Sequence, residues 1–595
     1  MPKPRMKADK PKNIKTATLQ LIRALKPWRL SVIFACVFAA GSTALAIFGP
    51  NILGNMTTDA VNSLTSSPDH QINWGPIVGS AITLIILYVV SGIFGYLESY
   101  LIGRATAKLG QDLRSKILDK ISRLPISYFD KTQFGDTLSR MSNDVDIMTE
   151  SLQNSLSDTI SNIVMIVGTL IMMFTISPWL SLIAIITVPL SLIFVGKSAK
   201  FAQRHFHAQQ NILGKLNSKI EESYAGGIVI KVNSHQPASI ADFSRTNDQL
   251  YEAGWKAQFF GSLAFPIAHF FTNLGYAAIC VLGGFQVISK TIAIGSLQAF
   301  IQYVNQFNRP ITSLAQIIGT LQLSLAASER VFTFLEEPEE TPDYEPARTI
   351  EKVKGKVDFH HMDFSYTPEK PVIKNFSATI WPGQKVALVG PTGAGKTTVV
   401  NLLMRFYDPV SGYITIDGTP TAEMKRADVR KLFGMVLQDT WLFSGTIEEN
   451  LKYGNEKATH SEVEKACKEC YVDHIISGLP KGYQTKISED SDNISAGEKQ
   501  LLTIARAMIA DPPMLILDEA TSNVDTRTEQ LIQDAMNKLT RGRTSFVIAH
   551  RLSTIRDADL ILVLRDGNIV EQGNHEELLK QNGFYAELYN SQFAE

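Results

Sequence analysis

A glycine-rich stretch, KVALVGPTGAGKTT from Lys385 to Thr398, has the residue types and spacing of a phosphate-binding loop. An apolar run ends at Gly390, and Gly395, Lys396 and Thr397 complete the pattern G-x-x-x-x-G-K-T. Glycines let consecutive backbone N–H groups turn inward at the start of a helix, where they stabilise a phosphate chain. In such a loop the lysine reaches the β- and γ-phosphates, and the threonine hydroxyl binds Mg²⁺. A strand–helix turn that binds nothing is the alternative.

Five further residues supply the other groups that phosphoryl transfer requires. The hydrophobic strand MLIL ends in Asp518 and Glu519, and we expect the first acid to hold Mg²⁺ and the second to polarise the attacking water. Two other apolar strands end at Gln438 and His550, and the histidine is placed to touch the γ-phosphate. Tyr366 is a candidate for stacking on the base. Each residue alone also fits a structural role, such as a capped core histidine, but together they predict binding and hydrolysis of a nucleoside triphosphate.

The first half of the chain contains six long apolar stretches, and crossing about 30 Å of hydrocarbon takes roughly 20 residues in a helix. Lys and Arg are absent from the connection 55–74 and from the Ser177-Pro178 turn, whereas the connections 103–156 and 197–256 are rich in both. The positive-inside rule therefore places the two long connections and both termini in the cytoplasm. The expected spans are residues 30–53, 77–102, 157–176, 179–196, 257–287 and 294–325.

The two long connections have the apolar periodicity of helices, so we expect helices that continue beyond the bilayer, turn and return. The turns are expected at 124–135 and at 228–236, and disordered loops are the alternative. Within the spans, Glu98, Asp158 and His269 are singled out as ionisable candidates for a substrate or proton role. Aromatic and amide side chains of the last two spans either line an apolar cavity or pack the helices; they are Phe259, Phe260, Phe265, Phe270, Phe271, Gln302, Tyr303, Asn305, Gln306 and Phe307.

Composition narrows the possible ligands and structural roles of several segments. The 595 residues have a formal net charge of −1, so nothing global indicates binding to nucleic acid. Four cysteines are too few for a disulfide framework, and Cys467 and Cys470 are expected on the solvent side of a helix rather than in a zinc site. The basic residues 1–29 suit a short helix in the membrane interface, with a nucleic-acid-binding arm as the alternative. Residues 336–346, EEPEETPDYEP, have the composition of a linker.

From about residue 355 onward, the chain resembles the nucleotide-binding domain of an ATP-binding cassette (ABC) transporter. The matching motifs are the A-loop (Tyr366), Walker A (390–398), the Q-loop (Gln438), Walker B (514–519), the D-loop (Ser522 and Asp525) and the H-loop (His550). With six spans in front, the whole chain resembles an exporter-type half-transporter.

The resemblance implies ATP and Mg²⁺ as ligands, and it implies a role for each matching residue. The implied catalytic residues are Glu519, His550 and Gln438. The implied metal ligands are Thr397, Gln438 and Asp518. The implied ATP-binding residues are Tyr366, Gly390, Pro391, Thr392, Gly393, Ala394, Gly395, Lys396, Thr397 and Thr398.

One motif departs from the family pattern. The signature, usually LSGGQ, is here ISAGE, in which Ser495, Ala496, Gly497 and Glu498 follow the first residue. In the family this helix N-terminus is presented to ATP held by the opposite protomer. Ala496 adds a Cβ where glycine allows close approach, and Glu498 adds a negative charge. Ser495 and Glu498 also form the S-x-x-E pattern of a helix capping box. We expect the altered motif to weaken the ATP site to which this chain contributes its signature.

The expected fold is an α-helical six-span transmembrane domain followed by an α/β P-loop ABC-type nucleotide-binding domain. The expected divisions are a basic segment with an interfacial helix (1–29), the transmembrane domain (30–330), a linker (331–354) and the nucleotide-binding domain (355–595).

The implied function is ATP-driven export of hydrophobic or amphipathic compounds, multidrug by family frequency, across a bacterial plasma membrane by alternating access. The expected partner is a second ABC half-transporter with a normal signature, giving a heterodimer with one hydrolytic and one degenerate ATP site. The expected substrate is a hydrophobic small molecule or lipid. A homodimeric lipid or peptide exporter or flippase is the alternative, followed by an ATP-gated channel or a regulatory protein. The six spans exclude a soluble cassette ATPase.

Overall fold

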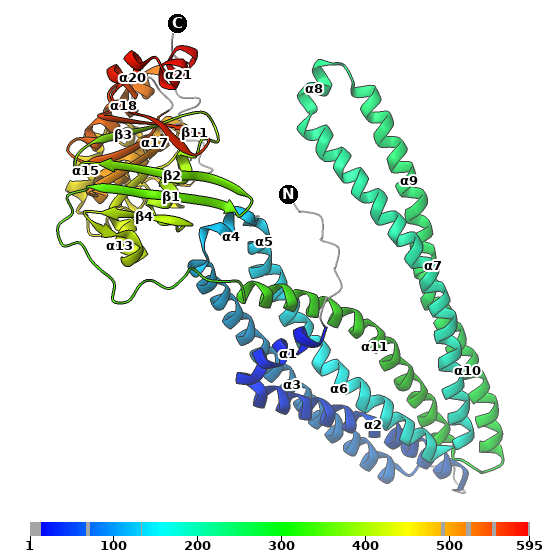
Figure 1. The fold of residues 1–595 in the computed structure, drawn as a ribbon. Coiled ribbons are helices and arrows are strands. Elements are labelled where there is room, and N and C mark those ends of the chain that lie inside the picture. Colours follow the sequence, from blue (N-terminus) through cyan, green and yellow to red (C-terminus); the bar gives the residue numbers. More distant parts are fainter. Residues whose placement is uncertain are drawn as a thin grey trace. The chain divides into compact units, whose positions relative to one another are not determined.

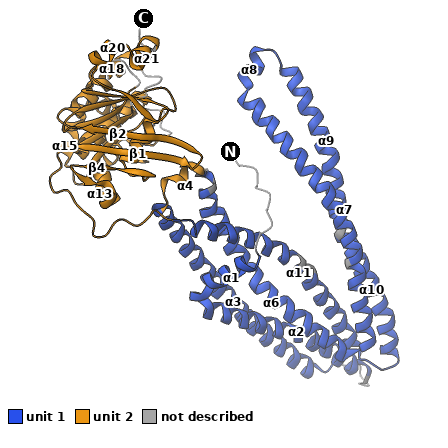
Figure 2. Cartoon of the chain, in the orientation of Figure 1, with its two compact units in different colours: residues 1–123, 132–338 blue, residues 124–131, 339–595 orange. Residues whose placement is uncertain are grey.

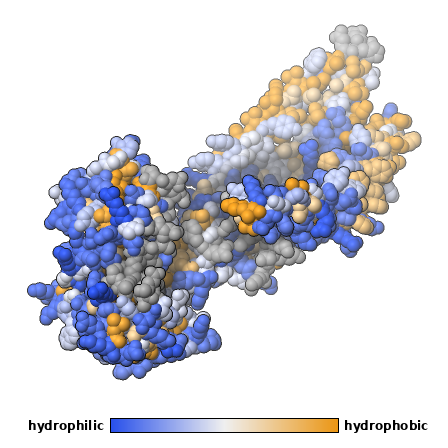
Figure 3. Space-filling view, turned by 90° about the horizontal axis from the view of Figure 1, so that it is seen from above, coloured by the Kyte–Doolittle hydropathy of each residue, from blue (hydrophilic) through white to orange (hydrophobic). Residues whose placement is uncertain are grey.

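The computed structural model describes residues 14–66, 72–132, 134–438, 440–488, 494–518, 525–549 and 555–592. Over this part of the chain two compact units are distinguished (Figure 2). The first, Met1–Arg123 with Thr132–Pro338, is helical, and the second, Leu124–Lys131 with Glu339–Glu595, contains the sheets. Hydrophobic side chains gather on the helical unit, and the visible face of the α/β unit is mostly hydrophilic (Figure 3).

Six helical passages of the described residues are long and apolar enough to cross a membrane, which confirms the predicted six-span organisation. The fifth predicted span is divided at Leu263, because one helix ends at Ser262 and another begins at Ala264. The spanning helices are α2 (Arg29–Ser66), α3 (Trp74–Arg123), α6 (Val145–Ile176), α7 (Pro178–Ala225), α9 (Gln236–Ser262) with α10 (Ala264–Ile288), and α11 (Ile294–Leu335).

Close contacts pack α2 against α11 near the ends that the positive-inside rule places outside. A Cβ on Gly295 would lie 1.6 Å from the carbonyl oxygen of Gly54, so glycine is required for this approach of the two backbones. Further along α11, about two turns after Gly295, the buried Tyr303 hydroxyl donates a hydrogen bond of 2.8 Å to the carbonyl oxygen of Ile47. These contacts set the register of two antiparallel helices.

Helices α3 and α7 have 50 and 48 residues. At 1.5 Å per residue they are about 75 and 72 Å long, more than twice the hydrocarbon thickness. The short helices α4 (Ile126–Lys131) and α8 (Gly227–Val232) lie in the two predicted turns, and α8 forms the tip of the hairpin of α7 and α9 (Figure 1). The expectation of long helical arms is confirmed.

In the described residues of the α/β unit, the larger sheet has the order β12-β11-β3-β10-β9-β6 and the smaller one β2-β1-β4-β5. The larger sheet is parallel except for β12. Its strands are β3 (Lys385–Val389), β6 (Phe433–Val436), β9 (Met514–Asp518), β10 (Thr544–Ile548), β11 (Leu560–Arg565) and β12 (Asn568–Gly573). The smaller sheet contains β1 (Val357–Thr367), β2 (Lys370–Ile380), β4 (Ser411–Ile416) and β5 (Thr419–Pro420).

Helix α12 (Lys396–Leu403) lies between the two sheets, because its apolar residues share one buried cluster with side chains from both. Helices α15 (His460–Glu469), α17 (Ala496–Ala510) and α18 (Thr526–Thr540) belong to the cluster on the other face of the larger sheet. Two layers of apolar packing therefore hold the sheet from which the phosphate-binding loop emerges.

Cys467 and Cys470 are fully buried in this second cluster, which corrects the expectation that they face solvent. Cys470 Sγ lies 3.7 Å from Met508 Sδ on α17, and burial raises the pKa of each thiol to about 12. Both are free cysteines that pack α15 against its neighbours as small apolar side chains.

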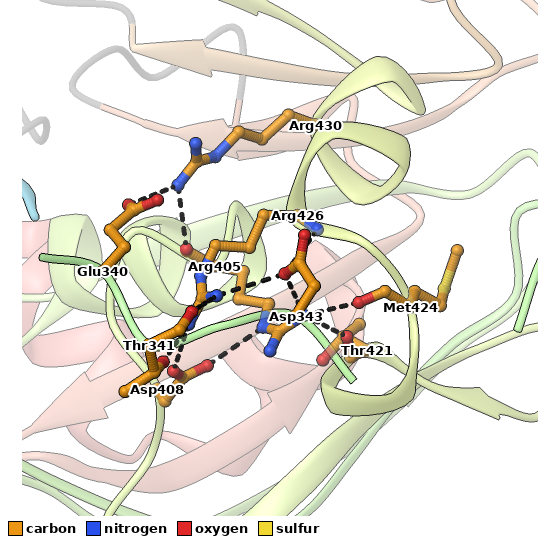
Figure 4. Close-up of polar contacts among 9 residues, drawn as sticks. All are labelled: Glu340, Thr341, Asp343, Arg405, Asp408, Thr421, Met424, Arg426 and Arg430. Atoms are coloured by element: carbon orange, nitrogen blue, oxygen red, sulfur yellow. Dashed lines mark hydrogen bonds and ion pairs between the residues drawn. The ribbon is translucent and has the colours of Figure 1, made fainter. Parts of the chain in front are cut away.

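Part of the acidic linker is held to the α/β unit by three arginines (Figure 4). The buried Arg426 donates hydrogen bonds of 2.6 Å to both the carbonyl and the hydroxyl of Thr341, and it pairs with Asp343 at 3.1 Å. It also reaches Asp408, which a second buried arginine, Arg405, contacts from the other side. The sequence predicted the linker from its composition. It could not predict the arginines that bind the linker, because they lie more than 60 positions further along the chain.

Candidate nucleotide-binding site

The strands that end in the predicted site residues finish at one edge of the larger sheet. Ile548 of β10 pairs with Leu388 of β3 on one side and with Asp518 of β9 on the other. Val436 of β6 pairs with Leu517, so Gln438 follows at the same edge. Ligands of open parallel sheets bind at the carboxyl ends of the strands, and this edge is such a place.

The loop between β3 and α12 has the conformation that its glycines predict. Gly390 has φ +156°, and a Cβ there would lie 2.3 Å from the carbonyl oxygen of Leu564. Gly395 has φ +104° at the N-cap of α12, in the left-handed region that disfavours side chains. The loop therefore presents the N-terminus of a buried helix, and its remaining members are Pro391, Thr392, Gly393 and Ala394.

Lys396 folds back into the loop. Its Nζ donates hydrogen bonds to the carbonyl oxygens of Gly390 (2.7 Å) and Pro391 (3.1 Å), and the residue is 9% exposed. Burial lowers the pKa of the ammonium group, and the nearby Asp518 carboxylate raises it in part. The cation is thus held beside the loop with an acid close by, which is a suitable arrangement for polyphosphate and a divalent metal.

The two threonines in the first turn of α12 differ in their exposure to solvent. Thr397 is exposed at the edge of the sheet, whereas Thr398 is buried. The Thr398 hydroxyl lies 3.2 Å from the hydroxyl of Tyr366, and Asn401 donates to the same Tyr366 oxygen at 3.4 Å. The predicted metal-binding hydroxyl is therefore accessible, and the second threonine positions the predicted base-stacking ring.

Tyr366 is 41% exposed and stands edge-on against two other rings. Phe364 lies 4.9 Å away at 85°, and Tyr407 lies 5.1 Å away at 88°, both measured between ring centroids and planes. The Tyr407 hydroxyl donates a hydrogen bond to the Asp130 carboxylate of α4. Sequence reasoning missed Tyr407, since no local pattern connects it to either partner.

Helix α17 begins with the predicted capping box. The Glu498 carboxylate accepts a hydrogen bond of 2.7 Å from the backbone N–H of Ser495, and the Ser495 hydroxyl accepts one of 3.3 Å from the backbone N–H of Glu498. The negative charge of the altered signature therefore lies at the N-terminus of this helix, with Ala496 and Gly497 in its first turn. The capping-box prediction is confirmed.

Arg506 of α17 is a second residue that sequence reasoning missed. It donates to the carbonyl oxygens of Asn450 (2.9 Å) and Trp441 (3.1 Å), and its guanidinium lies 5.9 Å from the Phe443 ring centroid. The arginine thereby ties the signature helix to the segment that follows Gln438. No spacing rule could have identified this contact.

Asp525 is the N-cap of α18, where its carboxylate accepts from the backbone N–H of Thr528 at 3.0 Å. That hydrogen bond lowers the pKa of the carboxyl group. The other D-loop residue, Ser522, and the predicted catalytic residues Glu519 and His550 lie outside the described residues. The edge therefore brings together the loop, Asp518 and Gln438. Strand β9 ends there directly before Glu519, and β10 ends there two residues before His550.

Two family models match the chain: the ABC transporter transmembrane region over residues 32–311 and the ABC transporter over residues 373–522. A fatty acid ABC transporter ATP-binding/permease protein of Mycobacterium bovis is 43% identical over 602 residues, covering 96% of this chain and 95% of the relative. An ATP-dependent lipid A-core flippase of Syntrophus aciditrophicus is 33% identical, covering 97% and 94%. A probable multidrug resistance ABC transporter ATP-binding/permease protein of Bacillus subtilis is 35% identical, covering 90% and 80%.

Proposed function

The chain belongs to the ABC transporter family, as an exporter half-transporter with fused membrane and ATP-binding domains, and from this we propose that it exports hydrophobic or amphipathic compounds by alternating access. ATP hydrolysis at the sheet edge would drive the cycle. The observation that carries the proposal is that the glycine-rich loop, Asp518 and Gln438 converge on one edge of a sheet, in a chain that also has six candidate membrane spans. Relatives whose names specify a fatty acid, a lipid A-core and multidrug resistance support lipids or drugs as the substrate class.

Each site residue has a role within this proposal. Lys396 and the loop from Gly390 to Thr398 would hold the phosphates, and Tyr366 would stack on the base. Glu519 would act as the catalytic carboxylate that orients and deprotonates water, while His550 and Gln438 would contact the γ-phosphate region.

The oxygen donors at this edge fit a magnesium ion, which prefers hydroxyl, amide and carboxylate oxygens. Thr397 is exposed there, and Asp518 lies close enough to Lys396 to raise the pKa of its ammonium group. Thr397, Gln438 and Asp518 would hold Mg²⁺, which would offset the negative charge of the phosphates.

The membrane orientation follows from charge. Lys and Arg gather in the connections 103–156 and 197–256, so the α/β unit and both termini would lie in the cytoplasm of a bacterial cell.

A second half-transporter is the proposed partner. At the tip of the α7–α9 hairpin, Ile228, Val229 and Val232 are 79%, 64% and 78% exposed. Apolar side chains at the cytoplasmic end of so long an arm lie beyond the hydrocarbon and need a protein surface to cover them. We assign that surface to the second half of the transporter.

The signature ISAGE supports a heterodimer over a homodimer. The Glu498 carboxylate at the start of α17 would repel a polyphosphate, so the ATP site completed by this helix would hydrolyse slowly. The other site, with this chain's loop and Glu519 and a normal signature from the partner, would be the hydrolytic one.

The test is ATP turnover by this chain alone in lipid, beside the Glu519→Gln variant, with ATP binding measured on both. ATP binding with little hydrolysis, restored by co-expression of a half-transporter with a normal signature, is expected. Robust hydrolysis by the chain alone, abolished by the substitution, would refute the heterodimer and retain the exporter ATPase. Absence of hydrolysis with every partner would refute the ATPase assignment itself.

A further inference from the structure

The chain joins the helical unit to the α/β unit at three places, namely Arg123–Leu124, Lys131–Thr132 and Pro338–Glu339. The first two flank α4, and the third follows α11, the last of the six candidate spans. Residues 340–343, which we call the strap, come shortly after the third place and belong to the α/β unit. The contacts on either side of Pro338 decide whether this connection is a loose linker or a mechanical one.

Within the helical unit, the last turns of α11 are held by two polar contacts. Arg330 donates hydrogen bonds of 2.9 and 2.6 Å to the carboxylate of the buried Asp144, the residue before α6. Glu336, the C-cap of α11, accepts a hydrogen bond of 2.7 Å from Gln20 of α1 (Ile14–Leu25). The chain therefore leaves the helical unit from a point that is fixed within that unit.

Within the α/β unit, the strap is bound along its length to the short helix α13 (Arg426–Lys431) (Figure 4). Arg430 donates a hydrogen bond of 3.1 Å to Glu340, the first residue of the strap. Arg426 bonds both the carbonyl and the hydroxyl of Thr341, and its guanidinium pairs with Asp343, the last residue of the strap. Both ends of the strap are therefore anchored to one helix.

A buried charge keeps the strap in place. Arg426 is only 7% exposed, and three of the acceptors that bond its guanidinium belong to Thr341 and Asp343. Of the acceptors that the described residues provide, undocking would leave only Asp408, a carboxylate that Arg426 shares with Arg405. Removing the partners of a buried charge is strongly unfavourable, so the strap resists being pulled away from α13.

The segment between the two anchored ends is short. Three residues lie between Glu336, which is bonded within the helical unit, and Glu340, which is bonded within the α/β unit. Four residue steps span at most about 14 Å even when the chain is fully extended. Transport cycles involve movements of helices and domains, and a segment of this length passes such a movement on rather than absorbing it.

The helix that receives the pull leads directly to the nucleotide site. Helix α13 is followed by β6, which lies at an edge of the larger sheet and precedes Gln438 by two residues. Arg405 lies two residues after the end of α12, and its guanidinium is 3.7 Å from the carboxylate of Asp343. A displacement of the strap therefore acts on the strand before Gln438 and on the far end of the helix that begins at the phosphate-binding loop.

We propose that the strap couples the nucleotide site to the membrane domain, by transmitting movement between the end of α11 and α13. The proposal rests on the proposed export function and gives the transporter a connection between its domains in addition to α4. It requires that the length of chain between Pro338 and the strap matters, whereas the length beyond the strap does not.

The test adds slack on either side of the strap. A Gly-Ser-Gly-Ser insertion between Pro338 and Glu339 lengthens the segment before the anchor by about 14 Å. The matched control is the same insertion between Glu351 and Lys352, two exposed residues of a bend beyond the anchor. Both keep the covalent connection and the same added length, and only the first adds slack between α11 and α13.

The measurement is hydrogen–deuterium exchange of the assembled transporter in lipid nanodiscs, with and without ATP and orthovanadate, which mimics the transferred phosphate. Peptides that cover residues 289–300 report on the end of α11 opposite the strap. Trapped nucleotide is quantified in every sample, so that exchange is compared at equal occupancy. Exchange in the buried strand β3 reports whether each variant is folded.

Nucleotide trapping should change the exchange of residues 289–300 in the wild type. The insertion at Pro338 should lose at least half of this change, and the insertion at Glu351 should behave as the wild type. A full change in the Pro338 insertion would show that α4 is sufficient and would overturn the proposal. Equal losses in both insertions would place the connection in the chain leading to β1 rather than in the strap, which would also overturn it.

A second variant releases the strap without changing the length of the chain. Thr341→Val combined with Asp343→Asn removes a hydroxyl and a carboxylate that bind Arg426, while all residues of α13 are retained. It should lose part of the change in exchange, and adding it to the Pro338 insertion should cause no further loss. A further loss in the combined variant would show that the substitutions act by another route.

The proposed export function fails separately. If the wild type shows no hydrolysis that Glu519→Gln abolishes, the ATPase assignment is refuted. If hydrolysis is present but nucleotide trapping does not alter exchange in the helical unit of the wild type, coupling to the membrane domain and therefore export are refuted. If both are present and either overturning pattern of the insertions is found, only the role of the strap is refuted.

Discussion

Tyr407 and Asp130 are joined by a hydrogen bond although 277 positions separate them in the chain. The tyrosine stands edge-on against Tyr366, the predicted base-stacking ring, and the aspartate belongs to α4, the short helix that follows α3. Burial and the neighbouring carboxylate both raise the pKa of the Tyr407 hydroxyl, which therefore remains a donor. One side chain thus connects the predicted base-stacking ring with the turn that follows α3.

We predict that Tyr407→Phe uncouples ATP hydrolysis from substrate. The variant keeps the ring contact with Tyr366 but loses a hydrogen bond to a charged group, worth about 1.5–3 kcal/mol. Stimulation by substrate should fall roughly tenfold, while the dissociation constant for ATP stays within about twofold. Asp130→Ala should have the same effect, and the double variant should be no worse than either single one. Additive losses in the double variant would show that the two residues act independently.

Signature repair should raise ATP turnover. Glu498→Gln preserves the capping box, so the variant should fold, and it removes the negative charge from the N-terminus of α17. The ATP site completed by this helix should then hydrolyse ATP faster. Combining it with Ala496→Gly should increase turnover further. The matched control, Ser495→Ala, breaks the cap, costs about 1 kcal/mol of stability and should not increase turnover. Unchanged turnover in the repaired chain would contradict the role given to Glu498.

Releasing the linker should destabilise the α/β unit. Arg426→Ala removes a buried guanidinium that bonds Thr341, Asp343 and Asp408, and we expect a loss of about 2–3 kcal/mol in the free energy of unfolding. Arg430→Ala removes a more exposed pair with Glu340 and should cost less than about 1 kcal/mol. Thermal unfolding in detergent would measure both, and equal losses would argue against a special role for Arg426.

Asp525 makes the stability of α18 depend on pH. Its pKa is lowered in the folded state by the hydrogen bond from Thr528, so its contribution is fully present above the ordinary aspartate value, about 3.9, and is lost as pH falls through the lower folded value. Asp525→Asn caps the helix without titrating. Between pH 7 and 3, the wild type should therefore lose more stability than this variant in matched thermal scans. An equal loss of stability in the wild type and in Asp525→Asn would show that titration of Asp525 does not contribute.

The sequence by itself determined the features that depend on local chemistry. Apolar runs of sufficient length defined the six spans, and fixed spacings identified the phosphate-binding loop from Gly390 to Thr397. The capping box of Ser495 and Glu498 was also readable, because its two partners lie three residues apart.

Only the tertiary structure decided which distant residues meet. It placed β10 between β3, which leads into the loop, and β9, which ends in Asp518, because sheet order depends on packing rather than on any periodicity. It buried Cys467, whose charged helix had suggested exposure. It also placed Tyr407 on Asp130 and set the register of α2 against α11. Such contacts arise from how whole elements pack, so no short stretch of sequence encodes them.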